Sequence, residues 1–394
     1  MRKNKTVPIY EPPAEDTFEE LPAEDIQEEL YEDETDELYE DMSEDMPETP
    51  ADDTSEQPFT FNYSIQILRF VLMFFMCINL FGLPKLLDGG EQTLCGFVPI
   101  AFFIISGFLV LREDEDRDAR IVRAIIRTAI AFVALVVAYG VINYFYYKAL
   151  GASILPAFRL KRLWFSFLVL NVWPFDIGGA IWYVQSLLYA YIIIFFLNKL
   201  KLLKHDWKIS AVLILITVLT GELSGIIPWS AIGFDYIPGN FLTRALPYVL
   251  LGAFLYRKKA VWEHIHIAFL ALGILAGVLM MCAEAYILGK FNLSGYYGHL
   301  LGMPVVAVSV CLFAFREKAN KQSEDVEPIF PRWQINCIYY FCQPVSAVLA
   351  LLMSLFGRES ADLFTFLGFI IFAISFILAL IVGKIVKAFK KKPE

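Results

Sequence analysis

Ionisable side chains lie inside several long hydrophobic stretches of this sequence. Arg69 and Arg244 are basic, Glu284 is acidic, and Asn79 and Gln185 add amide groups. A charge at the depth of a lipid bilayer costs about 3 kcal/mol or more, so such groups face an internal cavity or pair with another polar group. These residues therefore predict either a polar chamber inside a helical bundle or single hydrogen bonds between neighbouring helices.

A second concentration of charge consists of Arg120, Arg123 and Arg127. On a helix that advances about 100° per residue, these three positions fall within about 60° of arc. A stripe of guanidinium groups at a membrane surface is suited to a polyphosphate or an anionic headgroup. The same charges would also arise from membrane topology alone, because cytoplasmic loops are rich in Lys and Arg.

Few residues in or beside the hydrophobic stretches are candidates for a general base. The four histidines are His205, His264, His266 and His299, and the first three are expected at loop edges. His299 begins a hydrophobic stretch, where it is either an interfacial residue or a proton acceptor, and Glu284 is the other candidate acceptor. The six cysteines lack metal-ligand spacing. We therefore expect no metal site and no bound cofactor.

The chain that must position these residues has two unlike parts. It has 394 residues, 57% of them hydrophobic, but residues 1–60 hold 22 of the 42 acidic residues and have a net charge of −19. Such a segment cannot bury enough apolar surface to fold, so we predict a disordered acidic tail over 1–60 and a membrane domain over 61–394. The tail is either simply solvated or docks on a basic cytoplasmic protein, and its charge excludes nucleic acid as a partner.

The membrane domain is predicted to be an all-α, polytopic helical bundle with about ten spans across the lipid bilayer. A span needs about 20 mostly apolar residues. The predicted spans are 64–83, 92–111, 121–147, 178–198, 207–229, 240–256, 264–287, 297–315, 335–356 and 361–384. The shorter run 163–175, which contains Pro174, is expected to form an interfacial or re-entrant segment.

Charge in the connecting loops predicts the orientation of the bundle. Alternate loops hold 21 Lys and Arg residues, against 7 in the opposite set. Because loops rich in Lys and Arg stay in the cytoplasm, both termini are predicted to be cytoplasmic. The arginine stripe then lies at the cytoplasmic surface, and the loop 148–177 is the main external feature.

Several segments, in order along the chain, resemble the acyltransferase 3 family of membrane proteins. They are PIAFFIISGFLVLRE (99–113), RIVRAIIR (120–127), IWYVQSLLYAYIII (181–194), NFLTRALPYVLLGAFLYRK (240–258) and NCIYYFCQP (336–344). The resemblance runs from about residue 62 to the end of the chain. It implies transfer of an acyl group such as acetyl from cytoplasmic acyl-CoA, a co-substrate, to a hydroxyl of a cell-envelope sugar or polysaccharide, in a bacterial plasma membrane.

The resemblance also implies roles for individual residues. The acyl-CoA site would be formed by Arg120, Arg123, Arg127 and Ser106. The acceptor site would be formed by Arg244, Trp182 and Gln185. The candidates for the catalytic centre are Arg69, Asn79, Gln343, Glu284 and His299.

The sequence departs from the family where a base is expected. In the family a histidine follows the arginine of the first span by eleven residues, which on a helix places the two on one face about 16 Å apart. Here that position is Leu80, and Asn79 beside it is rotated by about 80° from the Arg69 face. A histidine that often precedes proline near the end of the family sequence is Gln343 here. Neither an asparagine nor a glutamine side chain accepts a proton from an alcohol.

Three hypotheses follow from these observations. The first is an O-acyltransferase whose base has moved to another position. The second is a catalytically inactive relative that serves as a partner subunit or binds a glycolipid. The third is a transporter of an envelope precursor, although the sequence shows no inverted repeat and no matching pair of broken spans.

Overall fold

The structure is a computed structural model that describes residues 63–81, 94–112, 117–149, 181–221, 241–290, 300–316, 332–355 and 367–390, with parts of 151–178. The acidic tail predicted for 1–60 and the candidate base His299 lie outside the described residues. The predicted interfacial run 163–175 is described only in part.

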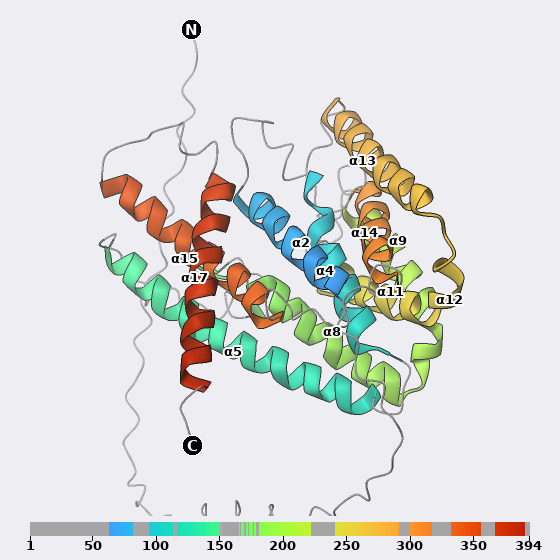
Figure 1. Ribbon diagram of the computed structural model, residues 1–394, viewed down its shortest axis with the longest axis horizontal. Helices are drawn as coiled ribbons and strands as arrows, with labels where there is room; N and C mark the ends of the chain where they lie inside the picture. The colour runs from blue at the N-terminus through green and yellow to red at the C-terminus, as the bar shows by residue number, and fades with distance from the viewer. Residues whose placement is uncertain are drawn as a thin grey trace, which may run out of the picture. The chain divides into compact units, whose positions relative to one another are not determined.

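Within the described ranges every regular element is a helix, which confirms the predicted all-α membrane bundle. The elements are α2 (Tyr63–Phe81), α4 (Phe97–Val110), α5 (Arg117–Ala149), α8 (Ile181–Lys199), η1 (Leu202–His205), α9 (Asp206–Gly221), α10 (Phe241–Arg244), α11 (Leu246–Arg257), α12 (Lys259–Trp262), α13 (Ile267–Lys290), α14 (Gly302–Phe315), α15 (Arg332–Leu355) and α17 (Leu367–Lys390) (Figure 1).

A helix coincides with each of the ten predicted spans. Among the described helices, α2, α5, α8, α13 and α17 are long and apolar enough to cross a membrane, and α4 and α14 are shorter apolar helices. The sixth predicted span is divided at Ala245 into α10 and α11. Pro247 lies in the first turn of α11, where its missing N–H costs no helical hydrogen bond.

Helix α4 lies at the centre of the packing. Nine of its 14 residues are buried, because its hydrophobic residues surround the whole helix and do not form a single stripe. Helices α2, α11 and α14 pack against it, while α5 lies along α8 and α15 packs against α17 (Figure 1).

Two contacts fix the relative direction of α2 and α15. Near the starts of the two helices Arg69 meets Asn336, and further along both helices the sulfur atoms of Cys77 and Cys342 lie 3.3 Å apart. Both contacts advance in the same chain direction, so α2 and α15 run parallel. Parallel packing is required of the first and ninth of ten spans that alternate in direction.

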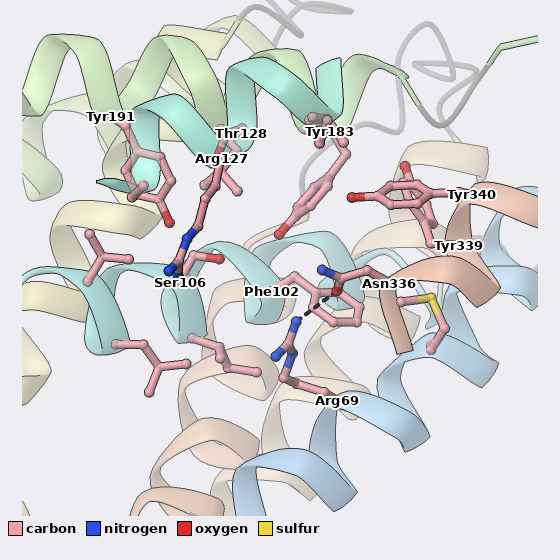
Figure 2. A pocket seen from close by; sticks show the side chains of 18 of the residues that line it. Arg69, Phe102, Ser106, Arg127, Thr128, Tyr183, Tyr191, Asn336, Tyr339 and Tyr340 are labelled. Atoms are coloured by element: carbon pink, nitrogen blue, oxygen red, sulfur yellow. Dashed lines mark hydrogen bonds between the residues drawn. The ribbon is translucent and has the colours of Figure 1, made fainter. Parts of the chain in front are cut away.

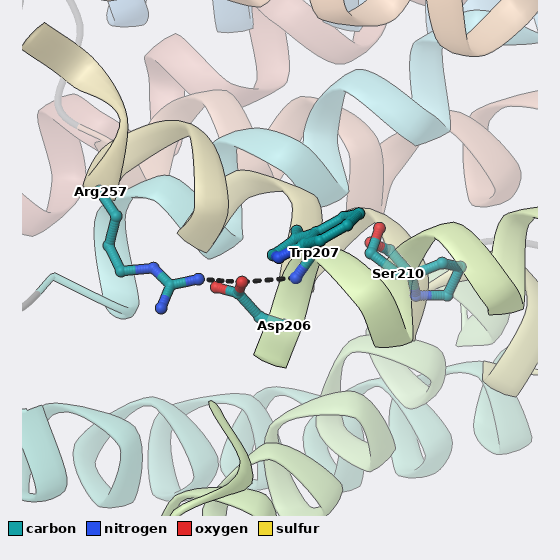
Figure 3. A network of polar contacts seen from close by, with 5 residues as sticks. Asp206, Trp207, Ser210 and Arg257 are labelled. Carbon is teal, nitrogen blue, oxygen red and sulfur yellow. Dashed lines mark hydrogen bonds and ion pairs between the residues drawn. The ribbon is translucent and has the colours of Figure 1, made fainter. Parts of the chain in front are cut away.

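A buried ion pair joins the start of α9 to the end of α11 (Figure 3). The Asp206 carboxylate, only 2% exposed, accepts hydrogen bonds from the guanidinium of Arg257 and from the backbone N–H of Trp207. The carboxylate therefore both neutralises the arginine and satisfies a free N–H at the helix start.

A candidate active site in an arginine-lined cavity

A cavity of about 530 Å³ lies among α2, α4, α5, α8 and α15. Its lining contains Arg69 from α2 and three arginines from α5, Arg120, Arg123 and Arg127 (Figure 2). The three α5 residues lie on one face of the helix, as their spacing predicts. The structure thus brings the arginine of the first span and the arginine stripe of the third span into one site.

The arginine-bearing part of the cavity lies at one end of the bundle. Arg69 is in the second turn of α2, Asn336 is in the second turn of α15, and the arginine stripe occupies the first turns of α5. Leu109 and Val110, at the end of α4, also line it. This is the end of the bundle where the loop charges of the sequence predict the cytoplasm.

Arg69 points into the cavity from α2 and is held by one partner (Figure 2). Its Nη2 donates a hydrogen bond to the Oδ1 atom of Asn336, at 2.8 Å. The guanidinium is therefore tied to a neutral amide, and its positive charge is not compensated by that partner. Phe102 and the hydroxyl of Tyr183 lie nearby in the same lining.

The three arginines of α5 make different contacts. Arg120 donates from Nε to the carbonyl of Val110 and from Nη2 to the carbonyl of Arg112, at 3.4 and 3.0 Å, so it caps the end of α4. Arg123 is exposed and donates to the carbonyl of Ala119 in its own helix, at 3.3 Å.

Arg127 is the cavity arginine that forms no hydrogen bond or ion pair to any described residue. Figure 2 shows its guanidinium extending from α5 toward Ser106 on α4, so that Arg127 and Arg69 enter the cavity from opposite walls. Its free N–H groups make it the arginine of the stripe best placed to receive an anion.

Hydroxyl groups supply most of the remaining polarity of the cavity. Tyr183 and Tyr191 from α8 share Ser106 as a hydrogen-bond partner. Tyr339 and Tyr340 from α15 also line the cavity, and the centre of the Tyr339 ring lies 5.8 Å from that of the Tyr183 ring. Tyrosine and serine hydroxyls donate and accept hydrogen bonds, and they carry no charge at neutral pH.

The described lining contains no aspartate, glutamate or histidine. Four guanidinium groups therefore meet hydroxyls, one amide and apolar side chains, and the described wall is strongly positive. Such a wall attracts a negatively charged ligand and supplies donors to a developing negative oxygen. It does not supply a side chain that is a base at neutral pH.

The positions where the family resemblance predicts histidine lie further along their helices. Asn79 and Leu80 are in the last turns of α2, beyond Met76, and neither lines the cavity. Gln343 also lies outside the lining, and its Oε1 accepts a hydrogen bond from the backbone N–H of Gly178, at 3.5 Å.

The other candidate acids and bases are not brought to the cavity within the described residues. Glu284 is on α13, and its carboxylate accepts a hydrogen bond from the backbone N–H of Gly302 on α14, at 3.4 Å. His299 precedes α14 outside the described residues.

The residues expected to contact the acceptor are not in the lining of the cavity. The guanidinium carbon of Arg244 lies 5.8 Å from the centre of the Trp182 ring, so the structure brings these two together in a cation–π contact. Gln185 is fully buried and donates to the carbonyl of Phe167, at 2.7 Å.

Sequence analysis did not single out Asn336, Thr128 or the four tyrosines of the cavity. The spacing of these polar residues along their helices is the feature of the sequence that could have identified them. Asn336, Tyr339 and Tyr340 stand at i, i+3 and i+4, and Tyr183 and Tyr191 are eight residues apart, so each set occupies one helix face. Polar residues repeated on one face of a hydrophobic helix indicate an interior polar surface.

Fold and site together define a polytopic membrane protein with an arginine-lined cavity inside its helical bundle. The sequence matches the acyltransferase 3 family model, described as an acyltransferase domain, over residues 62–384. The chain therefore belongs to this family, and the match includes every helix that lines the cavity. No curated protein and no solved structure matches the chain.

Proposed function

We propose that this protein is a membrane O-acyltransferase that takes an acyl group from acyl-CoA and transfers it to a hydroxyl of a cell-envelope sugar or polysaccharide. The observation that carries the proposal is the cavity, which places four arginines and no described carboxylate in one site. Membership of an acyltransferase family supports the reaction class.

The cavity suits the two ends of an acyl-CoA molecule. Phosphate groups at the mouth would pair with Arg123 and Arg127, because guanidinium groups bind phosphate oxygens in pairs. The pantetheine arm and the acyl group would lie deeper, along Met73, Met76 and Phe102. A volume of about 530 Å³ is within the usual range for a small-molecule site.

The proposed reaction is acyl transfer from a thioester to an alcohol. The acceptor oxygen attacks the thioester carbonyl carbon, a C–O bond forms, and the C–S bond breaks. The proton of the alcohol ends on the sulfur of the leaving CoA. Arg69 would donate hydrogen bonds to the carbonyl oxygen as negative charge develops on it, a contribution that often reaches about 100-fold in rate.

A second candidate function is a family member that binds acyl-CoA or a glycolipid without turning it over. Two features favour it: Leu80 and Gln343 stand where the family resemblance predicts histidines, and the described cavity lining holds no histidine or carboxylate. Such a protein would act as a partner subunit.

The first test uses the full chain in liposomes with labelled acetyl-CoA and an envelope polysaccharide. We expect the wild-type protein to transfer the labelled acetyl group to the polysaccharide, and we expect the Arg69→Ala variant to lose this transfer. Transfer that is unchanged in Arg69→Ala removes Arg69 from the mechanism, and binding of acetyl-CoA without transfer supports the second candidate.

The second test restores the family residues with Leu80→His and Gln343→His together. If the wild-type site lacks only its base, the double variant gains acetyl-CoA hydrolysis or transfer. No gain in a variant that still binds acetyl-CoA would mean that more than a base has been lost.

The proposed setting is a bacterial plasma membrane with both termini in the cytoplasm. Acyl-CoA would then enter from the side on which the arginine stripe lies. The tail of residues 1–60 would be on the same side of the membrane, where a basic cytoplasmic protein is its proposed partner.

A further inference from the structure

Arg69 is paired with an amide, although a cation at this depth is ordinarily paired with a carboxylate. Within the described residues its one hydrogen bond is the contact from Nη2 to Oδ1 of Asn336, at 2.8 Å. A guanidinium has five N–H groups, so four remain for other partners. Figure 2 shows the guanidinium directed into the cavity from α2, with Asn336 reaching it from α15.

The choice of amide has an electrostatic consequence. An aspartate at position 336 would accept the same hydrogen bond but would neutralise the arginine, whereas asparagine fixes the guanidinium and leaves its charge intact. Desolvating an arginine without a counter-ion is unfavourable, and this cost is reduced when a ligand supplies the negative charge.

We propose that Asn336 is a positioning residue: it holds the Arg69 guanidinium toward the cavity while preserving its full positive charge for a negatively charged oxygen of the ligand. This inference rests on the proposed function, in which the ligand is acyl-CoA.

A purely structural role for the contact makes a different prediction. If the bond only tied α2 to α15, aspartate would serve as well as asparagine, because it is nearly the same size and is a stronger acceptor. Other contacts already join this region, including Cys77 with Cys342 and Phe70 with Phe372 of α17. The isosteric variant Asn336→Asp therefore distinguishes the two roles, because it keeps the hydrogen bond between α2 and α15 but adds a negative charge beside Arg69.

The experiment measures binding of labelled CoA to the purified full chain in nanodiscs, together with thermal unfolding. In Asn336→Asp we expect unfolding close to that of the wild type and CoA affinity lowered about tenfold, because the cavity loses one net positive charge. In Asn336→Ala, which keeps that charge, we expect affinity to fall about threefold or less. Where transfer is measurable, Asn336→Asp should lower kcat by about 100-fold.

The matched control is Lys201→Asn, which also removes one positive charge at this end of the bundle. Lys201 is exposed in the turn after α8 and has a φ of 58°, a conformation that asparagine tolerates. The CoA affinity of the Lys201→Asn variant should stay within about twofold of the wild-type value, because exposed charges are screened by salt.

Two outcomes overturn the proposal. CoA affinity in Asn336→Asp equal to that of the wild type, or equal losses in the aspartate and alanine variants, would leave Asn336 a structural tie only. A wild-type protein that does not bind CoA would instead refute the proposed function, and this inference with it.

Discussion

At the scale of single residues, position in the sequence does not determine the role of a charge. Arg120 and Arg127 are two turns apart on one face of α5, and both line the cavity. Arg120 satisfies carbonyl groups at the end of α4, whereas Arg127 makes no described polar contact. The first is placed to stabilise the fold, and the second is placed to bind a ligand.

Exchanging each arginine for glutamine separates these roles. Arg127→Gln should lower CoA affinity about tenfold and leave thermal unfolding unchanged, because it removes only a ligand contact. Arg120→Gln should lower stability by about 1 kcal/mol, the usual contribution of such hydrogen bonds. CoA titration and thermal unfolding of both variants provide the comparison, and the reverse pattern would contradict the assignment.

The buried ion pair permits a second prediction at this scale. Arg257→Met removes a buried partner of the Asp206 carboxylate, and we expect a loss of about 3–5 kcal/mol in unfolding free energy. Adding Asp206→Asn to this variant should recover most of the loss. The measurement is unfolding in denaturant.

The control for the ion pair is Lys199→Met, which breaks the exposed pair of Lys199 with Asp118. We expect little change in the unfolding free energy of this variant, because exposed ion pairs are screened by water and salt. Equal losses in the two single variants would contradict the distinction between buried and exposed pairs.

At the scale of elements, two glycines set the distance between α4 and α11. A Cβ atom added to Gly107 would lie 1.9 Å from the carbonyl oxygen of Val249, and one added to Gly252 would lie 2.2 Å from the carbonyl oxygen of Ile104. The glycine in the SGFL segment of α4 therefore permits backbone contact between helices, which is typical of small residues at membrane helix interfaces. The neighbouring Ser106 is carried into the cavity by this packing.

We expect Gly107→Ala to force the two helices apart, lower the yield of folded protein, and destabilise it by about 1–3 kcal/mol. The control is Gly140→Ala in α5, where an added Cβ would meet nothing within 4 Å. That change should be neutral or slightly stabilising, since alanine favours helix. Thermal unfolding and size-exclusion profiles report both results, and equal behaviour would refute the close-contact account.

At the scale of the whole molecule, orientation decides which substrate reaches which end of the bundle. The cavity lies where α2, α5 and α15 begin, and the loop charges predict that this end faces the cytoplasm. Under the proposed function, a donor made in the cytoplasm would have direct access to the arginines, and the acceptor would approach from the opposite face.

Reporter fusions test this orientation. A fluorescent protein that folds only in the cytoplasm should be bright when fused after Lys201 or Lys258, which follow the fourth and sixth spans. An alkaline phosphatase that is active only outside should work when fused after Lys290, which follows the seventh. Phosphatase activity in the fusion after Lys201 would mean that the bundle has the opposite orientation. The arginines would then face away from cytoplasmic acyl-CoA.

The sequence by itself predicted where the ten hydrophobic spans lie and indicated the family. Hydrophobic length is a local property, so each predicted span coincides with a helix, and the break before α11 follows from Pro247. Sequence analysis also identified Arg69 and the arginine stripe, because charges in apolar stretches are conspicuous whatever their partners are.

Only the tertiary structure decided which of these residues share a site. Asn336 stands 267 positions from Arg69, and no local pattern connects them. The separate roles of Arg120 and Arg127, and the placement of Glu284 at the contact between α13 and α14, likewise depend on which helix faces meet. Helix formation is governed by neighbours in the chain, whereas a site between helices is governed by packing between segments that the sequence keeps far apart.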